Sequence, residues 1–341
     1  MIDDIILKDL RRVCDSLDER HFSGKKVLIS GGAGFVGSWL SDALLDLGAS
    51  VTCVDNLSTG QIANINRLLG HARFRFLKTD VVDFRADEKY EYLLHLASRA
   101  SPEEYQLHPI DTLLANSLGS HTMLELARKM DCRIFYSSTS EVYGDAQIVP
   151  TPEDCWGNVN PIGPRSCYDE GKRFGEALFM AYKQEYGLDI RVARIFNSYG
   201  PRNRATGPYA RVVSRFVQQA LSGDPITVYG DGSQTRSFCY IADTILGLLM
   251  LLTARNAGGE VVNIGTSEEI TILDLAKMIK GIAQSESRIV FCPLPAEDPR
   301  RRCPDISKAK RVLGWTPTIS LNEGLKRTIE SLGQHPCCSA S

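Results

Sequence analysis

The central part of the chain holds a tyrosine and a lysine four positions apart, Tyr168 and Lys172. Side chains at that spacing on a helix share one face, so the lysine ammonium would lie beside the phenol. A neighbouring ammonium stabilises a phenolate and lowers its pKa from the reference value of about 10. The pair therefore predicts a base that can take a proton from a hydroxyl group. Most tyrosine–lysine pairs at this spacing are ordinary helix-surface residues. Other parts of the sequence must therefore show whether this pair is catalytic.

A glycine-rich segment, residues 31–37, follows a short apolar run and precedes a helical pattern. The glycine fingerprint of dinucleotide-binding proteins is specific only where it follows a strand and opens a helix, and this segment has that position. We expect Gly31 to permit the tight turn, Gly34 to let the backbone approach a pyrophosphate, and Gly37 to let the helix pack close to the sheet. The pyrophosphate would lie on the free N–H groups at the helix N-terminus. A glycine-rich turn without a ligand is the alternative.

An aspartate, Asp55, ends the next apolar run about eighteen residues after Gly37. A carboxylate there accepts hydrogen bonds from ribose hydroxyls and repels a 2′-phosphate, so the sequence predicts NAD as the cofactor in preference to NADP. A helix-capping aspartate is the alternative. The other residues predicted to contact NAD are Phe35, Val36, Asn56, Ser58, Thr59, Gly60, Asp80, Val81, Leu96 and Ala97, together with Tyr168 and Lys172.

The composition argues against several classes of protein. The chain has 341 residues, of which 43% are apolar, and a formal net charge of −2. It can bury a large core, and its charge gives no reason to expect nucleic acid or an anionic membrane as a partner. The ten cysteines and six histidines show no metal-ligand spacing, so no metal site is predicted and His95 is expected in the core. The cysteines are scattered along the chain, and the N-terminus is acidic and lacks the apolar run of a signal peptide. Both features favour a cytoplasmic protein.

The elements that must position these residues alternate between strands and helices from Lys26 onward. Such alternation is typical of an α/β fold with a doubly wound parallel sheet, the Rossmann fold. Strands are predicted at 27–29, 51–54, 74–77, 92–96, 133–136 and 189–195, and helices at 35–47, 109–129 and 166–186.

The sequence divides into four segments. Residues 1–24 hold an amphipathic helix, which is expected to lie outside the main fold and to dock on the surface or on a partner subunit. Residues 25–196 form the predicted NAD-binding Rossmann domain. Residues 197–333 form mainly a smaller C-terminal lobe that binds the substrate and is interleaved with the last sheet strands. Residues 334–341 are a tail.

With these features in place, the chain resembles the extended short-chain dehydrogenases that act on nucleotide sugars, over about residues 25–333. The glycine segment, Thr139 and the pair of Tyr168 and Lys172 carry the resemblance. Longer strings are similar to those of the UDP-glucuronate decarboxylases, or UDP-xylose synthases, within that family: residues 138–144, 163–173, 211–214, 229–236 and 298–305. The strings 97–102 and 202–207 depart from the usual ones. The resemblance implies a Rossmann fold, NAD, a UDP-sugar substrate and a homodimer formed through the two long helices.

The reaction that this resemblance implies is the NAD-dependent decarboxylation of UDP-glucuronate to UDP-xylose. Tyr168 would take the proton of the sugar 4-hydroxyl while C4 passes a hydride to NAD⁺, with Lys172 holding the phenolate and Thr139 hydrogen-bonded at the same oxygen. The carboxylate is then β to a 4-ketone, so carbon dioxide can leave before the hydride returns to C4. Related dehydratases place an aspartate where this chain has Ser140, and a serine is a poor acid for expelling water.

The resemblance also assigns the residues that hold the sugar nucleotide. Glu141 is expected to position the sugar and to move protons, and Arg302 to hold the carboxylate or a phosphate. A solvated glutamate and a solvated run of arginines are the alternatives. The remaining predicted substrate contacts are Tyr105, Asn197, Arg211, Tyr229 and Arg236.

Two other functions stay open from the sequence. A 4-epimerase of a nucleotide-linked uronic acid shares the oxidation step but must suppress the loss of carbon dioxide, and the Thr-Ser-Glu string at 139–141 argues against it. A non-catalytic NAD-binding sensor is a different class of protein. It would be expected to lack Tyr168 or Lys172, and both are present.

Overall fold

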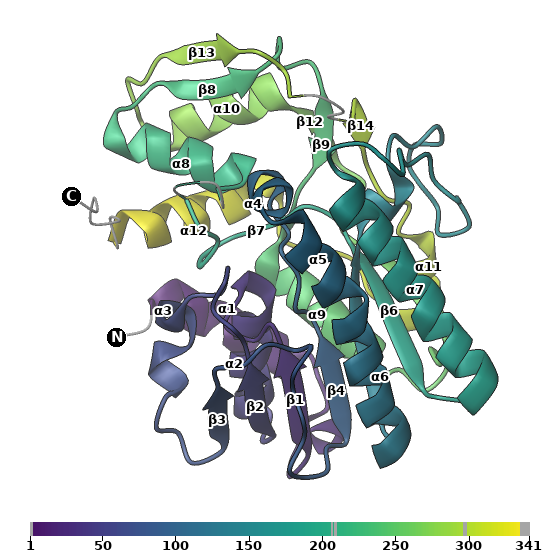
Figure 1. Ribbon diagram of the computed structural model, residues 1–341. Coiled ribbons are helices and arrows are strands. Elements are labelled where there is room, and N and C mark those ends of the chain that lie inside the picture. The colour runs from purple at the N-terminus through teal and green to yellow at the C-terminus, as the bar shows by residue number, and fades with distance from the viewer. Residues whose placement is uncertain (1–2, 206, 208–209, 296–298, 335–341) are drawn as a thin grey trace.

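A parallel sheet of seven strands forms the centre of the molecule (Figure 1). The computed structural model describes residues 3–205, 207, 210–295 and 299–334. The strands are β1 (Lys26–Ser30), β2 (Ser50–Val54), β3 (Phe74–Leu77), β4 (Tyr92–His95), β5 (Arg133–Thr139), β6 (Ile190–Ile195) and β11 (Glu260–Ile264). They lie in the order β11-β6-β5-β4-β1-β2-β3, and every pairing is parallel. The predicted Rossmann fold is confirmed.

Helices cover both faces of this sheet. The main ones are α2 (Phe35–Asp46), α6 (Leu118–Met130), α7 (Ser166–Tyr186) and α9 (Ile241–Thr253). Val27 and Ile29 of β1 belong to the hydrophobic cluster that contains α2 and α9, whereas Leu28 belongs to the cluster that contains α6 and α7. Successive strand residues point to opposite faces, so a sheet covered on both sides needs continuous apolar runs. This is why the strands read as unbroken apolar segments.

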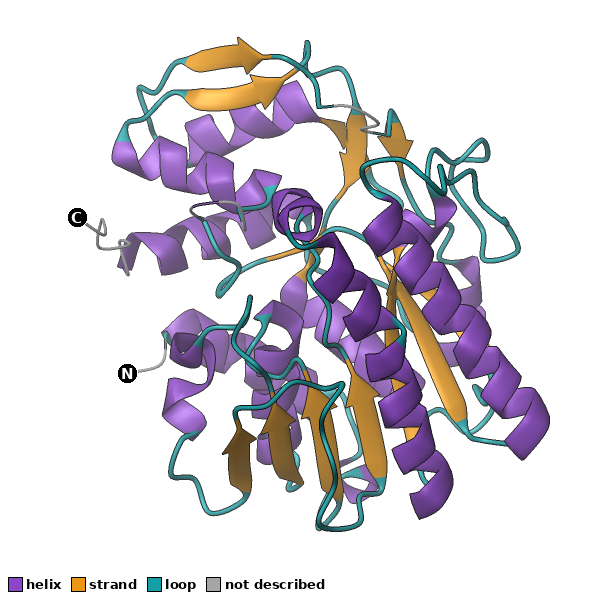
Figure 2. Ribbon diagram, in the orientation of Figure 1, coloured by secondary structure: helices purple, strands orange, loops and turns teal. Residues whose placement is uncertain are grey.

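A smaller lobe lies beyond the carboxyl ends of the main strands, where the arrows of the main sheet point in Figure 2. The remaining elements of the second half of the chain are β7 (Ser198–Tyr199), α8 (Val212–Ser222), β8 (Ile226–Tyr229), β9 (Thr235–Ser237), β10 (Cys239–Tyr240), β12 (Glu269–Thr271), α10 (Ile272–Ile282), β13 (Ile289–Cys292), β14 (Arg301–Arg302), α11 (Ser307–Leu313) and α12 (Leu321–Gln334). In the smaller lobe β8 pairs with β13, and β9 lies between β12 and β14. Strand β11 returns to the main sheet beside β6, so the two parts of the chain are interleaved.

The helix predicted at 109–129 is interrupted. It consists of α5 (Pro109–Asn116) and α6, and α4 (Pro102–Leu107) precedes them. The break lies at Ser117, where φ is −102° and ψ is −76°. The Ser117 hydroxyl donates a hydrogen bond to the carbonyl of Leu113 at 2.6 Å, and such local bonds compete with the regular helix ladder. The prediction of one continuous helix is therefore wrong.

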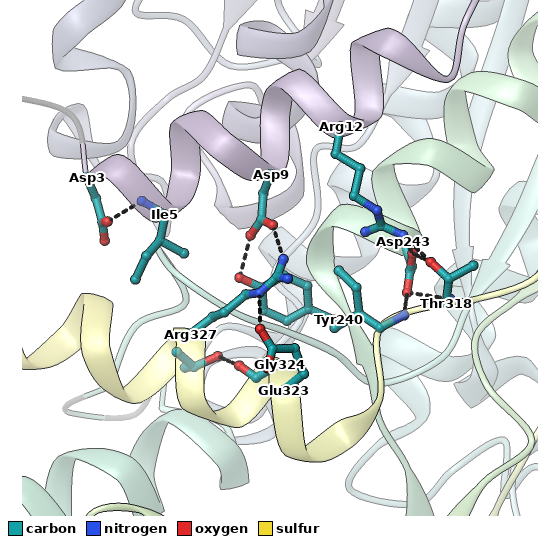
Figure 3. Close-up of polar contacts among 12 residues, drawn as sticks. Asp3, Ile5, Asp9, Arg12, Tyr240, Asp243, Thr318, Glu323, Gly324 and Arg327 are labelled. Atoms are coloured by element: carbon teal, nitrogen blue, oxygen red, sulfur yellow. Dashed lines mark hydrogen bonds and ion pairs between the residues drawn. The ribbon is translucent and has the colours of Figure 1, made fainter.

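The N-terminal helix, α1 (Asp4–Asp15), packs onto the same chain. Leu10 and Val13 are buried in the cluster that contains α2 and α9. The Asp9 carboxylate accepts a hydrogen bond from the Tyr240 hydroxyl at 2.7 Å and forms an ion pair with Arg327 of α12 (Figure 3). Arg12 pairs with Asp243 of α9 at 2.9 Å. The prediction that this helix lies outside the main fold is wrong, because α1 contributes to its core.

Several smaller predictions can be compared with the described residues. His95 is 1% exposed and its ring nitrogens contact the hydroxyls of Ser30 at 2.8 Å and Ser120 at 3.1 Å, so its predicted place in the core is confirmed. No helix in the described part of the chain is long and apolar enough to cross a bilayer. Among the same residues, no group of three or more His, Cys, Asp or Glu could hold a metal ion. The tail at 335–341 and Asp298 of the string 298–305 lie outside the described residues.

Candidate active site

A cavity of about 510 Å³ opens at the carboxyl ends of the main strands. Ligands of open α/β sheets bind at this edge, and the volume suits a bound small molecule. The walls bring together these predicted residues: Gly31, Gly34, Phe35, Val36, Gly37, Asp55, Asn56, Ser58, Thr59, Asp80, Val81, Leu96, Ala97, Thr139, Tyr168, Lys172, Asn197 and Arg211. The predicted residues that do not line it are Gly60, Tyr105, Ser140, Glu141, Tyr229, Arg236 and Arg302.

The glycine segment forms a tight turn between β1 and α2. Gly31 has a φ of +76°, and a Cβ there would lie 2.8 Å from the backbone nitrogen of Ala97. A Cβ on Gly37 would lie 2.2 Å from the carbonyl oxygen of Gly31. Only glycine fits at either position, so the loop, the helix and the end of β4 meet closely. Gly34 is the N-cap of α2 and supplies no side chain to its first turn.

Asp55 is fixed at the edge of the cavity by backbone groups. It is 7% exposed, and it accepts hydrogen bonds from the N–H of Ala33 at 3.0 Å and of Leu57 at 2.8 Å. Burial raises the pKa of this carboxyl, while the two backbone bonds oppose that rise. The next helix, α3 (Ile62–Ile65), has Gln61 as its N-cap, so Asp55 is not the helix cap that was the alternative. Gly60 packs against the Asp55 carboxylate, since a Cβ there would lie 2.7 Å from it.

Tyr168 and Lys172 occupy the first turns of α7 and are almost fully buried, at 5% and 2% exposure. The Lys172 ammonium donates to the carbonyl of Ser137 at 2.8 Å and lies 4.8 Å from the centre of the Tyr136 ring. Ser137 belongs to β5, the strand that ends at Thr139. Helix α7 and strand β5 therefore bring the tyrosine, the lysine and the threonine to one wall of the cavity.

The pKa values of this pair differ from the expectation based on spacing. Burial raises the pKa of Tyr168 to about 12, against the lowering effects of Arg211 and of a hydrogen bond with Thr139. Burial also lowers the pKa of Lys172 to about 7. Lys172 is not among the groups with the largest effect on the pKa of Tyr168, and its ammonium donates to the carbonyl of Ser137. The groups that favour the phenolate are Thr139 and Arg211.

Glu141 follows Thr139 in the short 3-10 helix η3 (Ser140–Tyr143). Its Oε2 atom accepts hydrogen bonds from Arg165 at 2.5 Å and from Arg302 at 2.6 Å. Burial would raise the pKa of this carboxyl, but Arg302 and Arg165 hold the pKa below its usual value. Glu141 and Arg302 are thus neither a solvated glutamate nor a solvated arginine. Ser140, between Thr139 and Glu141, is 3% exposed.

Tyr105 lies directly against Tyr168. The two rings stack with their centroids 5.0 Å apart and their planes 1° from parallel. Tyr105 is 1% exposed, and its hydroxyl has no hydrogen-bond partner among the described residues. Burial raises the pKa of Tyr105, so its hydroxyl stays protonated. Its contribution in this structure is to hold the Tyr168 ring.

The remaining predicted substrate residues separate into two groups. Arg211 and Asn197 line the cavity; Arg211 donates to the carbonyl of Ala100 at 3.1 Å and Asn197 to that of Ser237 at 3.0 Å. Arg236 is 7% exposed, and one of its amino groups donates to the carbonyl of Thr235 at 2.9 Å. Tyr229 lies under Arg215, 4.6 Å from its guanidinium carbon, in the smaller lobe.

Sequence reasoning missed several polar residues of the cavity. They include Ser98, Arg99, Ser137, Ser138, Arg202, Asn203 and Arg204. Five of these fall in the strings 97–102 and 202–207, which departed from the family pattern, and that departure was the available signal. Arg99 pairs with Glu104 at 2.7 Å, and Arg202 pairs with Asp42 at 2.6 Å. Arg165 was also missed, although it lies only three positions before Tyr168.

The cavity fits a dinucleotide. The first turn of α2 has no side-chain cap, and its N–H groups at the glycine turn suit a pyrophosphate. Asp55 and Asn56 both line the wall where a ribose would bind. The Asn56 side chain donates a hydrogen bond to Asp80 at 2.7 Å. Tyr168 and Lys172 belong to the same lining. The residues present therefore match the needs of NAD.

Comparison with known sequences gives one family. The profile of the family described as GDP-mannose 4,6 dehydratase matches residues 28–328. UDP-glucuronic acid decarboxylase 1 of Danio rerio is 48% identical over 309 residues, which cover 90% of this chain and 72% of that protein. UDP-glucuronic acid decarboxylase 3 of Arabidopsis thaliana is 46% identical over 301 residues, covering 88% of this chain and 86% of that protein.

Solved structures of the same fold are also similar. The UDP-glucose 4-epimerase of Thermotoga maritima, solved with UDP-glucose, is 34% identical with a TM-score of 0.83, covering 91% of this chain and 99% of that one. The UDP-glucuronic acid 4-epimerase of Bacillus cereus, in complex with UDP-glucuronic acid and NAD, is 30% identical with a TM-score of 0.82 and the same two coverages.

Proposed function

Because the chain belongs to the extended short-chain dehydrogenase/reductase family of nucleotide-sugar epimerases and dehydratases, we propose that it is an NAD-dependent carboxy-lyase that converts UDP-glucuronate into UDP-xylose. The observation that carries this proposal is the likeness to UDP-glucuronic acid decarboxylases at 46% to 48% identity over about nine-tenths of the chain. The cavity supports it, because its lining combines the glycine loop with the buried Tyr168 and with Arg211.

The residues around Tyr168 act on the sugar 4-hydroxyl. NAD, when bound, supplies the oxidation and the later reduction at C4. Tyr168 takes the proton of the 4-hydroxyl once its own proton has been released, which the neighbouring Thr139 and Arg211 favour. Thr139 lies at the end of β5, where its hydroxyl accepts from the N–H of Glu141 at 3.3 Å and is hydrogen-bonded to Tyr168. Lys172, fixed on Ser137, keeps the first turns of α7 against β5.

Loss of carbon dioxide follows from the chemistry of the oxidised sugar. The carboxylate at C5 is β to the 4-ketone, so the electrons of the breaking carbon–carbon bond move into the ketone as an enolate. The enolate then takes a proton at C5. Arg302 has a buried Nε with no hydrogen-bond partner among the described residues, so it has a donor to offer the carboxylate. Glu141, beside it, is ionised and positioned to accept a hydrogen bond from the sugar or from a water.

Dehydration is the reaction that the family name would suggest, and Ser140 argues against it. An acid is needed to expel a 6-hydroxyl as water, and a serine hydroxyl does not ionise near neutral pH. Ser140 is buried, between Thr139 and Glu141 in the sequence.

A 4-epimerase of UDP-glucuronate is the second candidate, because an enzyme of that kind, solved with UDP-glucuronic acid and NAD, has the same fold. Its identity to this chain is 30%, lower than the 48% of the decarboxylase from Danio rerio. The two reactions differ in a single outcome: the decarboxylase releases carbon dioxide and the epimerase keeps all six sugar carbons.

One assay tests the proposal. The protein is incubated with UDP-glucuronate and NAD⁺, carbon dioxide is measured, and the nucleotide sugar is identified by NMR. We expect equimolar carbon dioxide and UDP-xylose. UDP-galacturonate without carbon dioxide would establish the epimerase instead, and a complete lack of turnover with full NAD binding would favour a non-catalytic NAD-binding protein.

The Tyr168→Phe variant extends this assay. Loss of the hydroxyl should lower turnover by at least about 100-fold, since a positioned acid–base group contributes about that much, while NAD still binds. Tyr186→Phe, on the exposed end of the same helix, is the control and should keep full activity. If Tyr168→Phe loses NAD binding as well, the tyrosine has been given the wrong role.

We also propose a homodimer and a cytoplasmic location. The outer faces of α5, α6 and α7 expose Ile110 (70%), Leu113 (41%), Leu118 (49%) and Phe174 (50%). Apolar side chains gathered on neighbouring helices favour burial against a second copy. The eight cysteines in the described residues are all unpaired, which suits a reducing compartment.

A further inference from the structure

Four charged side chains form a buried row beside Tyr168, in the order Asp169, Arg165, Glu141 and Arg302. Arg165 Nη2 and Arg302 Nη2 both donate to Oε2 of Glu141, at 2.5 Å and 2.6 Å. Arg165 Nε lies 3.7 Å from Oδ2 of Asp169. The side chains of the four residues are between 8% and 14% exposed. Water therefore screens this row poorly, and each charge has to be balanced by its neighbours.

If a hexuronate binds here, Arg302 has to interact with two carboxylates, that of Glu141 and that of the substrate. Its Nη2 is engaged by Glu141, while its Nε is buried without a hydrogen-bond partner among the described residues. A substrate carboxylate at that free donor would place two carboxylates on one guanidinium. Two like charges that close, in a poorly screened site, disfavour each other strongly. A second cation is needed to keep Glu141 ionised while Arg302 turns to the substrate.

Arg165 is the cation in the right place. It shares the same oxygen of Glu141 and enters from the start of α7, whereas Arg302 enters from β14 of the smaller lobe. Arg236 also lowers the pKa of Glu141, but one of its amino groups is bonded to the carbonyls of Thr235 and Arg300. Burial and the nearby Glu141 raise the pKa of Asp169 to about 7, so Asp169 is only partly ionised at neutral pH and cancels only part of the Arg165 charge. Two arginines and one glutamate leave one positive charge, which one carboxylate neutralises.

We propose that Arg165 is a positioning residue that holds Glu141 in place and balances its charge when Arg302 binds the carboxylate of the hexuronate. The proposal rests on the proposed function, since it presupposes a uronate substrate. Arg165 itself bonds Glu141 and does not line the cavity. Its role should therefore appear in the binding of ligands that carry a carboxylate, and should be absent for ligands that do not.

Binding measurements on NAD-loaded protein test this selectively. Titration calorimetry in the Tyr168→Phe background, which prevents turnover, compares UDP-glucuronate with UDP-xylose, the same nucleotide sugar without the carboxylate. Arg165→Met should weaken UDP-glucuronate by about 10-fold or more and UDP-xylose by less than about 2-fold, since a lost charged hydrogen bond has effects of that size. Arg165→Lys, which keeps the charge, should recover most of the affinity. Equal weakening of both ligands, or no weakening, overturns the proposal.

A second substitution separates charge balance from simple damage to the fold. If Glu141 repels the substrate once Arg165 is gone, Glu141→Gln in the Arg165→Met protein should restore part of the UDP-glucuronate affinity. Absence of any restoration contradicts the charge argument. If Arg165→Met does not fold, the comparison of the two ligands is made with Arg165→Gln, where a loss confined to UDP-glucuronate supports the charge argument and an unchanged affinity for both ligands overturns it.

Arg133→Met is the matched control. Arg133 begins β5, the strand that leads to Glu141, and it pairs with Asp189 at 2.7 Å at the opposite end of the sheet. Removing that ion pair should leave the ratio of the two affinities unchanged. Failure of the proposed function is visible separately: it would appear as no release of carbon dioxide by the unmodified protein, whatever the Arg165 variants do.

Discussion

Asp169 shares the first turn of α7 with Tyr168 and is 5% exposed. Burial is the main reason that its pKa is raised to about 7, and the charge of Glu141 adds to it. One Asp169 oxygen has no hydrogen-bond partner among the described residues. The folded protein therefore binds a proton at this carboxyl more tightly than the unfolded chain does.

This difference predicts how stability changes with pH. A carboxyl whose pKa is raised on folding contributes stability that is fully present below the unfolded pKa of about 4 and is lost as pH rises through about 7. Asp169→Asn cannot titrate, so it should gain stability relative to the unmodified protein between pH 5 and pH 8, by at least about 1 kcal/mol. Thermal unfolding at the two pH values measures it. A difference between the proteins that does not change with pH would contradict the assignment.

At the level of residues, the sequence predicts which residues line the cavity better than it predicts which side chains bond to each other. The glycine segment, Asp55 and Tyr168 could be placed because the order of strand, loop and helix determines which residues reach the edge of a parallel sheet. Glu141 bonds residues 24 and 161 positions away, and no spacing rule links such distant parts of a chain. The raised pKa of Tyr168 could not be predicted from the sequence either, because its main cause is burial in the folded protein.

Helix α1 connects parts of the molecule that are far apart in sequence. Its Asp9 contacts Tyr240 and Arg327, and its Arg12 contacts Asp243 (Figure 3). Asp243 also accepts hydrogen bonds from the backbone N–H groups of Thr318 and Ile319. Through these contacts α1 joins α9 and the segment that leads into α12.

The apolar side of α1 should therefore matter for global stability. Leu10 is fully buried, so Leu10→Ala should lower the free energy of unfolding by about 2 to 5 kcal/mol, the usual cost of such a cavity. Lys8→Ala, at an exposed position of the same helix, should change it by less than about 0.5 kcal/mol. Chemical denaturation of both variants measures the difference. Similar values for the two would mean that α1 unfolds independently of the rest.

Elements were predicted well where periodicity was long and apolar. The strands and the helix that carries Tyr168 match their predicted places, since buried parallel strands leave unbroken apolar runs. The break at Ser117 was missed because apolar periodicity continues across it. The docking of α1 was missed because an amphipathic pattern shows that a helix has an apolar side and says nothing of what covers it.

The molecule exposes an apolar surface on α5, α6 and α7, which we proposed as the interface of a dimer. Ile110→Glu would place a charge on both copies at a two-fold interface, so the variant should be monomeric at micromolar concentrations where the unmodified protein is dimeric. Sedimentation velocity measures the change. Phe291→Glu, which alters a residue of β13 that is 58% exposed, is the control and should stay dimeric. A monomeric unmodified protein would rule out this surface as a stable interface.

Strand β11 has a consequence for the biosynthesis of the protein. It supplies the outer neighbour of β6 from residues 260–264, more than sixty residues after β6 ends. A nascent chain that has emerged only as far as β6 consequently presents an open sheet edge, with its amide and carbonyl groups available to other strands. The ribosome must deliver the first part of the smaller lobe, with α8, β8 and β9, before that edge closes. Truncated products that stop short of residue 260 should accordingly depend on chaperones or aggregate.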